Sequence, residues 1–301
     1  MPKYCYVKKN FGQSSLDIIT AANQIIDDYQ AQGYKLTLRQ LYYRFIANDL
    51  FPDSWMDPSG TKNTMKNYKH LGDIINDGRL AGLIDWEAIE DRTRNVRALA
   101  HWNSPSEILE ACATQYRRDK WEDQQYRPRV WIEKDALVGV IEGICNEHDV
   151  PFFSCRGYTS QSEMWAAAQA IEREIDEGYT PIIFHFGDHD PSGIDMTRDI
   201  TDRIEMFMGG IEVRRLALNM NQIQEFNPPP SPAKITDSRS TAYIANYGGD
   251  SWELDALEPS VLVGLVEGAI LSVKDTTVWA KSLRKEKAEQ KKIIKLAGTI
   301  K

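Results

Sequence analysis

The sequence predicts a mixed α/β fold in which a helical N-terminal part precedes a larger unit built on a mostly parallel sheet. Two observations carry this prediction. In the first hundred residues, apolar side chains recur at helical spacing. From about residue 128 onward, short apolar segments alternate with amphipathic helical patterns, and repeated β–α units of this kind form parallel sheets. At roughly 100 to 200 residues per domain, a chain of 301 residues has room for two domains.

The composition is that of an ordinary globular protein, with 42% hydrophobic and 27% charged residues. No stretch approaches about eighteen consecutive apolar residues, so we expect no membrane span. The N-terminal residues lack the pattern of a secretory signal, and we therefore expect a cytoplasmic protein. The four cysteines lie far apart, with spacing that fits neither a disulfide framework nor a structural zinc site.

Charge is distributed unevenly along the chain, whose net charge is -8. Residues 101–278 carry 15 basic and 30 acidic side chains, whereas residues 279–301 carry 8 basic and 2 acidic ones. The acidic middle would repel nucleic acid unless divalent cations neutralise some carboxylates or a basic surface elsewhere binds it. Any binding of double-stranded DNA is therefore expected to depend on the N-terminal part and the basic tail.

Residues 1–100 predict three short helices followed by a Gly-punctuated hairpin or wing in the segment GRLAGLIDW. Three helices and a wing resemble a winged-helix DNA-binding module. Candidate contacts to DNA phosphates are basic residues in and beside the third helix: Lys62, Lys66, Lys69 and Arg79. The competing interpretation is that a lysine stripe is simply a solvated helix face.

The remainder divides into a linker helix within residues 101–127, an α/β unit over residues 128–278 and a basic C-terminal helix over residues 279–301. The α/β unit predicts four strands, with the sequences RVWIE, PFFSC, TPIIFHF and VRRLAL, and helices between them. The Pro- and Gly-rich segment from NPPPSP to YGGDS predicts a loop.

Three carboxylates follow strands of this predicted sheet. Glu133 closes RVWIE, and Asp188 and Asp190 follow TPIIFHF directly. The carboxyl ends of parallel strands meet at one edge, so the three side chains should converge there, where their oxygens suit Mg²⁺. The alternative is that such acids only cap helices; Asp190, which precedes Pro191, is a plausible N-cap.

Two adjacent tyrosines lie in the second predicted helix. Tyr42 shares the apolar face with Leu41 and Phe45, whereas Tyr43 lies four residues from Arg39, where phenol and guanidinium can meet. A phenol with a pKa near 10 is a poor nucleophile at neutral pH and needs a nearby cation or a metal-bound phosphate to activate it. The competing interpretation makes Tyr43 an ordinary surface tyrosine.

A Glu after the first strand, Glu133, followed later in the chain by the turn GDHDPSG, resembles the pattern of the Toprim domain. This metal-dependent fold is shared by topoisomerases, some primases and some nucleases. In that domain, a Glu after the first strand and a later Asp-x-Asp hold Mg²⁺. The match runs from about Pro128 to the segment WELDAL. The resemblance thus implies that Glu133, Asp188 and Asp190 are Mg²⁺ ligands.

Together, the segment RQLYYRF and the Toprim-like unit resemble the A subunit of topoisomerase VI and its meiotic double-strand-break relatives. That family carries an Arg-acid-aliphatic-Tyr-Tyr motif whose second Tyr attacks DNA. Arg39, Leu41, Tyr42 and Tyr43 match the motif, while Gln40 stands where the family often has an acid. The chain is compact for the family, as in a minimal phage or mobile-element version.

The resemblance implies that Tyr43 attacks a backbone phosphorus, releases a 3′ hydroxyl and stays attached to the 5′ phosphate. It also implies a homodimer in which Tyr43 works with the partner's metal site. Glu253 and Asp255, in the segment WELDAL, would be supporting groups at the site or ordinary helix-start acids. Strand passage would require a separate ATPase subunit, because the sequence has no P-loop motif. Two alternatives remain: a hydrolytic Toprim nuclease and a non-catalytic DNA-binding protein.

Overall fold

The structure is a computed structural model that describes residues 3–89, 99–233 and 236–299. Its centre is a four-stranded sheet with the strand order β2-β1-β3-β4, and every neighbouring pair is parallel. The strands are β1 (Tyr126–Ile132), β2 (Phe152–Ser154), β3 (Thr180–Phe186) and β4 (Glu212–Ala217). All four predicted strands are therefore confirmed, as is the parallel sheet.

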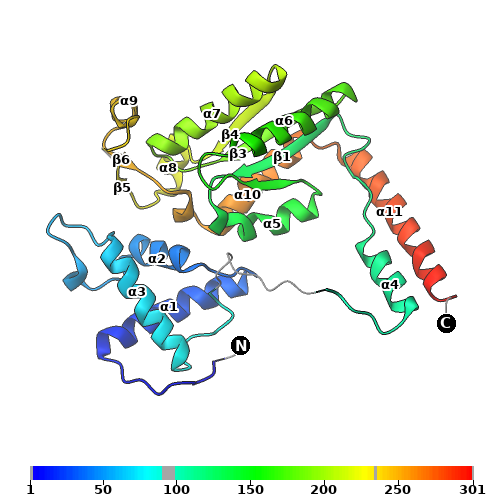
Figure 1. Ribbon diagram of the computed structural model, residues 1–301. Helices are drawn as coiled ribbons and strands as arrows, with labels where there is room; N and C mark the ends of the chain where they lie inside the picture. The colour runs from blue at the N-terminus through cyan, green and yellow to red at the C-terminus, as the bar shows by residue number, and fades with distance from the viewer. Residues whose placement is uncertain (1–2, 90–98, 234–235, 300–301) are drawn as a thin grey trace.

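Helices cover both faces of this sheet (Figure 1). They are α5 (Val138–Glu147) and α10 (Pro259–Val273) on one face, with α6 (Gln161–Asp176) and α7 (Pro191–Met208) on the other. Alternation along the strands explains the two layers, since successive side chains point to opposite faces. Val130 and Ile132 join the core under α5 and α10, whereas Trp131 joins the core under α6 and α7.

The segment predicted as a loop holds more structure than its composition suggests. It contains α9 (Ser240–Tyr247) and a two-stranded antiparallel ribbon of β5 (Ser231–Pro232) and β6 (Asp250–Ser251); α8 (Met220–Phe226) precedes it. Tyr243 anchors α9: its buried hydroxyl lies 2.8 Å from the backbone oxygen of His189 and 3.0 Å from that of Asp250. The prediction was wrong here because these tertiary contacts, which local sequence does not reveal, stabilise the helix.

The N-terminal part has the three expected helices, α1 (Gln13–Ala31), α2 (Leu38–Ala47) and α3 (Met65–Leu80). The predicted hairpin is not formed within residues 3–89. Its first three residues end α3, and the next, Ala81, makes an isolated bridge with Cys5; Ile89, beyond the segment, makes another with Leu36. Gly82 turns the chain at a φ of 73°, where a side chain would meet the Cys5 backbone. The expected domain boundary adjoins residues 90–98, which lie outside the described residues.

Two further helices pack against each other at one end of the molecule: α4 (Pro105–Gln115), within the expected linker, and α11 (Thr276–Ala297) (Figure 1). The Tyr116 hydroxyl donates to Glu289 at 2.7 Å and joins the two helices. The basic C-terminal helix begins at Thr276 because Asp275 caps it, accepting the N–H groups of Thr277 and Val278. None of the helices in the described parts of the chain is long and apolar enough to span a membrane.

Candidate functional site

Glu133 and Asp188 meet at the carboxyl ends of the two central strands. Strands β1 and β3 are neighbours in register, Ile132 beside Phe186, so the residues that follow them are also adjacent. The Asp188 backbone N–H donates to Glu133 Oε2 at 2.8 Å. Between the strand and Asp188, Gly187 leaves room for this contact, because a Cβ there would lie 3.0 Å from Glu133 Oε2. The predicted convergence therefore holds for these two carboxylates.

Asp190 has a different position, as the N-cap of α7. Its Oδ1 accepts the Gly193 N–H at 2.6 Å, and Pro191 occupies the first helical turn. The helix-capping alternative therefore describes what Asp190 does in this structure. Across residues 3–89, 99–233 and 236–299, no group of three or more His, Cys, Asp or Glu side chains is arranged to hold a metal ion.

Lys134 is a central residue of the site that the sequence interpretation missed. Its ammonium lies 2.9 Å from Asp188, 2.8 Å from Glu253 and 3.0 Å from Asp255. Burial alone would lower the pKa of Lys134, but the three carboxylates raise it above its usual value, so the ammonium keeps its charge. The sequence signal that could have identified Lys134 is its position directly after Glu133, at the end of a predicted strand.

The pair of strand-end carboxylates is under electrostatic strain. Burial, followed by the charge of Asp188, raises the pKa of Glu133. Burial also raises the pKa of Asp188, although Lys134 opposes that effect. A cation beside both groups would relieve this repulsion, and Mg²⁺ commonly takes one or two carboxylates and keeps water or phosphate as its other ligands. In this structure both oxygens of Asp188 have partners, because Oδ1 accepts the Leu254 N–H at 2.7 Å and Oδ2 pairs with Lys134 at 2.9 Å. A Mg²⁺ ion at Glu133 and Asp188 would therefore have to replace Lys134 as the cation beside Asp188, and Asp190 does not supply the expected third ligand.

Arg215 shapes the turn that carries Asp188 and was also missed. Its partly buried guanidinium, carried by β4, donates to the backbone oxygens of Asp188 at 2.6 Å and Gly193 at 2.8 Å. Burial lowers the pKa of Arg215 to about 10, and it remains charged at neutral pH. The charged guanidinium of Arg215 therefore holds the turn from Asp188 to Gly193 in place.

Helix α2 carries Arg39 and Tyr43 toward these carboxylates. The helix starts at a capping box in which Thr37 accepts the Gln40 N–H and the Gln40 side chain accepts the Thr37 N–H at 2.8 Å. This gives Gln40, the departure from the family motif, a capping role. Arg39 pairs with Glu253 at 2.6 Å and with Asp255 at 3.3 Å, and its guanidinium carbon lies 5.9 Å from the Tyr43 ring centre.

Tyr43 is buried, only 4% exposed, so the interpretation as a surface tyrosine is wrong. It lines the same pocket as Glu253, whose negative charge acts on the Tyr43 hydroxyl. Burial and the charge of Glu253 raise the pKa of Tyr43 above its usual value. Side-chain contacts therefore run from Tyr43 through Arg39, Glu253 and Lys134 to Asp188, all within one chain.

Tyr42 is a core residue, as its helical position predicts. Its ring packs against Phe51 and Tyr68, and its hydroxyl accepts the Thr64 N–H at 2.8 Å. Both tyrosines line a pocket of about 130 Å³. The pocket is lined by Arg39, Tyr42, Tyr43, Asn63, Thr64, Met65, Tyr68, Ser231 and Glu253.

The four candidate DNA contacts fall into two groups. Lys62 pairs with Asp49 at 2.8 Å and Asp53 at 2.9 Å. Arg79 donates to the Trp86 backbone oxygen at 2.6 Å, and its guanidinium lies over the Trp86 ring. Both of these side chains are engaged by their own chain. Lys66 and Lys69 are exposed on α3, where they are accessible to a phosphate.

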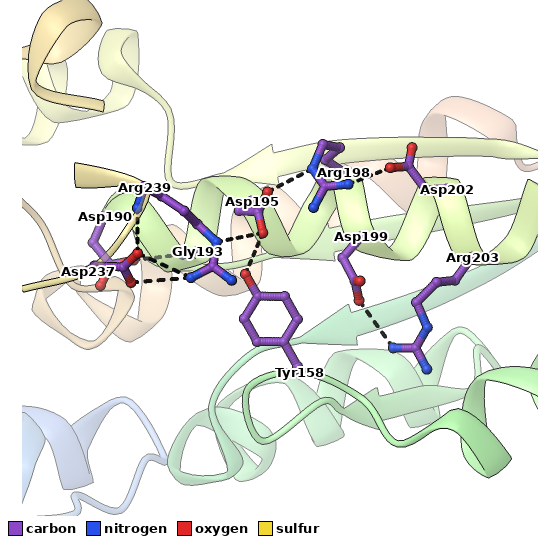
Figure 2. A network of polar contacts seen from close by, with 10 residues as sticks. All are labelled: Tyr158, Asp190, Gly193, Asp195, Arg198, Asp199, Asp202, Arg203, Asp237 and Arg239. Carbon is purple, nitrogen blue, oxygen red and sulfur yellow. Dashed lines mark hydrogen bonds and ion pairs between the residues drawn. The ribbon is translucent and has the colours of Figure 1, made fainter. Parts of the chain in front are cut away.

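A second polar network joins the loop before α6 to α7 and to the segment that leads into α9 (Figure 2). Asp195 of α7 accepts from the Tyr158 hydroxyl at 2.6 Å, from Arg198 at 2.7 Å and from Arg239 at 2.8 Å. In the same loop, Ser160 caps α6 by accepting the Glu163 N–H. Tyr158, Arg198 and Arg239 therefore donate to Asp195 of their own chain, and Ser160 serves as a helix cap.

Searches of protein-family models, curated proteins and solved structures find no match to this chain.

Proposed function

We propose that this protein cleaves DNA by a Mg²⁺-dependent tyrosine transesterification, with Tyr43 as the nucleophile. The observation that carries the proposal is the contact between two segments remote in sequence: Arg39, whose guanidinium lies over the Tyr43 ring, pairs with Glu253, which Lys134 joins to Asp188 at the sheet edge. A nucleophile and a charged site for phosphate chemistry are thereby assembled in one place. The resemblance of RQLYYRF and GDHDPSG to the topoisomerase VI A-subunit family supports the same activity.

The reaction joins the Tyr43 oxygen to a backbone phosphorus and breaks the bond from that phosphorus to the 3′ oxygen. The hydroxyl proton passes to solvent, and the departing 3′ oxygen takes a proton from solvent. Arg39 and Lys134 place positive charge around the transferring phosphate. Bound at Glu133 and Asp188, Mg²⁺ would supply charge stabilisation for the phosphate.

Glu253 lies in the same pocket as Tyr43 and is a weak base. Burial alone would raise its pKa, but Lys134 and Arg39 lower it to about 2. The carboxylate therefore stays ionised, while Tyr43 itself stays protonated until a phosphate approaches. This accounts for a resting site in which the nucleophile is held but not activated.

A second candidate, a hydrolytic nuclease that uses the same carboxylates and a water nucleophile, is favoured by one observation. Tyr43 is buried and its pKa is raised, which makes it a poor nucleophile in this conformation. In that case Tyr43 would serve only to hold Glu253. DNA would be cut without becoming attached to protein.

The two activities are separated by incubating the protein with end-labelled duplex DNA and Mg²⁺, then denaturing it with detergent. Transesterification leaves labelled DNA attached to protein, whereas hydrolysis gives free fragments. We expect attachment in the wild type and none in Glu133→Gln, which removes one carboxylate charge from the pair at the sheet edge. Cutting without attachment would select the nuclease. Binding without any cutting would leave a non-catalytic DNA-binding protein.

A further inference from the structure

Helix α11 presents one strongly basic face to solvent on an otherwise acidic protein. Its inward positions recur at helical spacing and include the buried residues Trp279, Ser282 and Glu286. Seven exposed side chains on the rest of its surface are basic: Lys281, Arg284, Lys285, Lys287, Lys291, Lys292 and Lys295. The exposed surface of this helix therefore carries an excess of positive charge, while the whole chain has a net charge of -8.

The two acidic residues of α11 do not neutralise this face, because both are used on the inward side. Glu286 accepts the Arg118 backbone N–H at 2.8 Å and pairs with Lys120 at 3.0 Å. Glu289 accepts the Tyr116 hydroxyl and pairs with Arg118 at 3.2 Å. Over the described residues, none of the seven exposed cations forms an ion pair. The acids fix α11 to its neighbours and leave the basic face uncompensated.

Like charges along this face weaken the helix unless an anion lies against it. Lys281 and Lys285 are four residues apart, as are Lys287 and Lys291, and such like-charge pairs destabilise a helix. From Lys281 to Lys295 the face runs for about 21 Å, at about 1.5 Å per residue. A ligand that relieves this repulsion along its whole length must be an extended polyanion.

A membrane surface is a poorer fit than a nucleic acid. A helix that lies on a membrane needs a free apolar face, but the inward face of α11 is occupied by α4 and by the Trp121–Trp279 contact. Its large exposed apolar side chains in the described part of the chain are Ile294 and Leu296, both at the C-terminal end. Charge without a free apolar stripe favours binding to phosphates in water.

We propose that the exposed face of α11 binds the phosphate backbone of duplex DNA. The proposal rests on the proposed function in taking DNA as the substrate, and it assigns part of the binding to an element remote in sequence from Tyr43. It also accounts for how an acidic chain holds a polyanion when Lys62 and Arg79 are engaged internally. The contact carries no base information and is expected to be independent of DNA sequence.

The test compares two double variants of the full chain by fluorescence anisotropy with a labelled duplex, without divalent ions, over a series of salt concentrations. Lys285→Gln/Lys292→Gln removes two charges from the face, and Gln preserves helix propensity. The control, Arg173→Gln/Arg214→Gln, removes an exposed charge from α6 and a partly buried charge from β4 that pairs with Glu212. We expect the α11 variant to bind roughly tenfold or more weakly and to reduce the slope of log K against log salt by about 2, while the control changes little.

An unchanged salt slope in the α11 variant, or an equal loss in the control, would overturn the proposal. So would competition by vesicles of anionic lipid that is stronger than competition by unlabelled duplex. The adduct assay keeps this result separate from the proposed function. At saturating DNA the α11 variant should still form the adduct, whereas Tyr43→Phe should bind DNA normally and form none. Loss of binding in the α11 variant with no adduct in the wild type would support the inference and reject the transesterase.

Discussion

The hydroxyls of the adjacent residues Tyr42 and Tyr43 lie in different surroundings. Removing each one therefore tests packing and chemistry separately. The hydroxyl of Tyr42 accepts the Thr64 N–H, so Tyr42→Phe should cost about 1 to 2 kcal/mol by leaving that donor unsatisfied, with adduct formation retained. The hydroxyl of Tyr43 lies near the charge of Glu253, and Tyr43→Phe should keep the fold and abolish the adduct. Urea denaturation and a denaturing gel measure the two effects. An adduct that persists in Tyr43→Phe and disappears in Tyr42→Phe would show that the wrong tyrosine is assigned.

Removal of Lys134 tests whether the site is built to hold a cation. Lys134→Met keeps much of the side-chain volume but leaves Asp188, Glu253 and Asp255 without their shared ammonium. Breaking a buried ion pair on one side typically costs about 3 to 5 kcal/mol, and we expect a loss of this order. Because uncompensated carboxylates attract Mg²⁺, the ion should raise the melting temperature of the variant more than that of the wild type. If Mg²⁺ raised the melting temperatures of the variant and the wild type by the same amount, this account would be contradicted.

Among the elements, those defined by local apolar patterns were predictable, and those held by remote contacts were not. The four strands and their parallel order follow from runs such as TPIIFHF and from the intervening helices. Helix α9 escaped prediction because Tyr243 anchors it to His189, more than fifty residues away. The same holds in the site. Strand ends predicted the meeting of Glu133 and Asp188, but the placement of Lys134 against Glu253 depends on how distant segments pack.

The network around Asp195 fixes the α9 segment to α7 and predicts a pH dependence (Figure 2). Hydrogen bonds from Arg198 and Tyr158, together with the positive charge of Arg239, lower the pKa of Asp195 from 3.8 to about 2. A depressed carboxyl pKa contributes stability that is present above the unfolded-state value and is lost as the pH falls toward 2. Asp195→Asn should therefore lower the melting temperature at pH 6, with a gap from wild type that narrows between pH 4 and pH 2. A gap that stays constant over this range would show that the ionised carboxylate contributes nothing.

For the whole molecule, the N-terminal helices dock onto the segment that follows Glu253. Arg44 pairs with Glu258 at 2.5 Å, the Tyr29 hydroxyl donates to Glu258 at 2.9 Å, and Ala256 is buried in the N-terminal core. This docking brings Tyr43 to the carboxylates of its own chain. The family resemblance implies a different arrangement, a homodimer in which Tyr43 serves the metal site of the partner.

Mixing two inactive variants distinguishes these arrangements. Tyr43→Phe lacks the nucleophile, and Glu133→Gln lacks a carboxylate of the sheet-edge pair. If Tyr43 acts on the site of its own chain, neither variant contains a complete site and their mixture should form no adduct. If Tyr43 acts across a dimer, one site in each mixed dimer is complete, and the mixture should recover adduct up to about one quarter of the wild-type level, since random exchange gives half mixed dimers with one working site of two. The contacts of Arg39, which lies over the Tyr43 ring and pairs with Glu253 of the same chain, predict no recovery, measured after co-refolding so that subunits exchange. Recovery with adduct on the Glu133→Gln chain alone would show that the in-chain contact is a resting state that must open before cleavage.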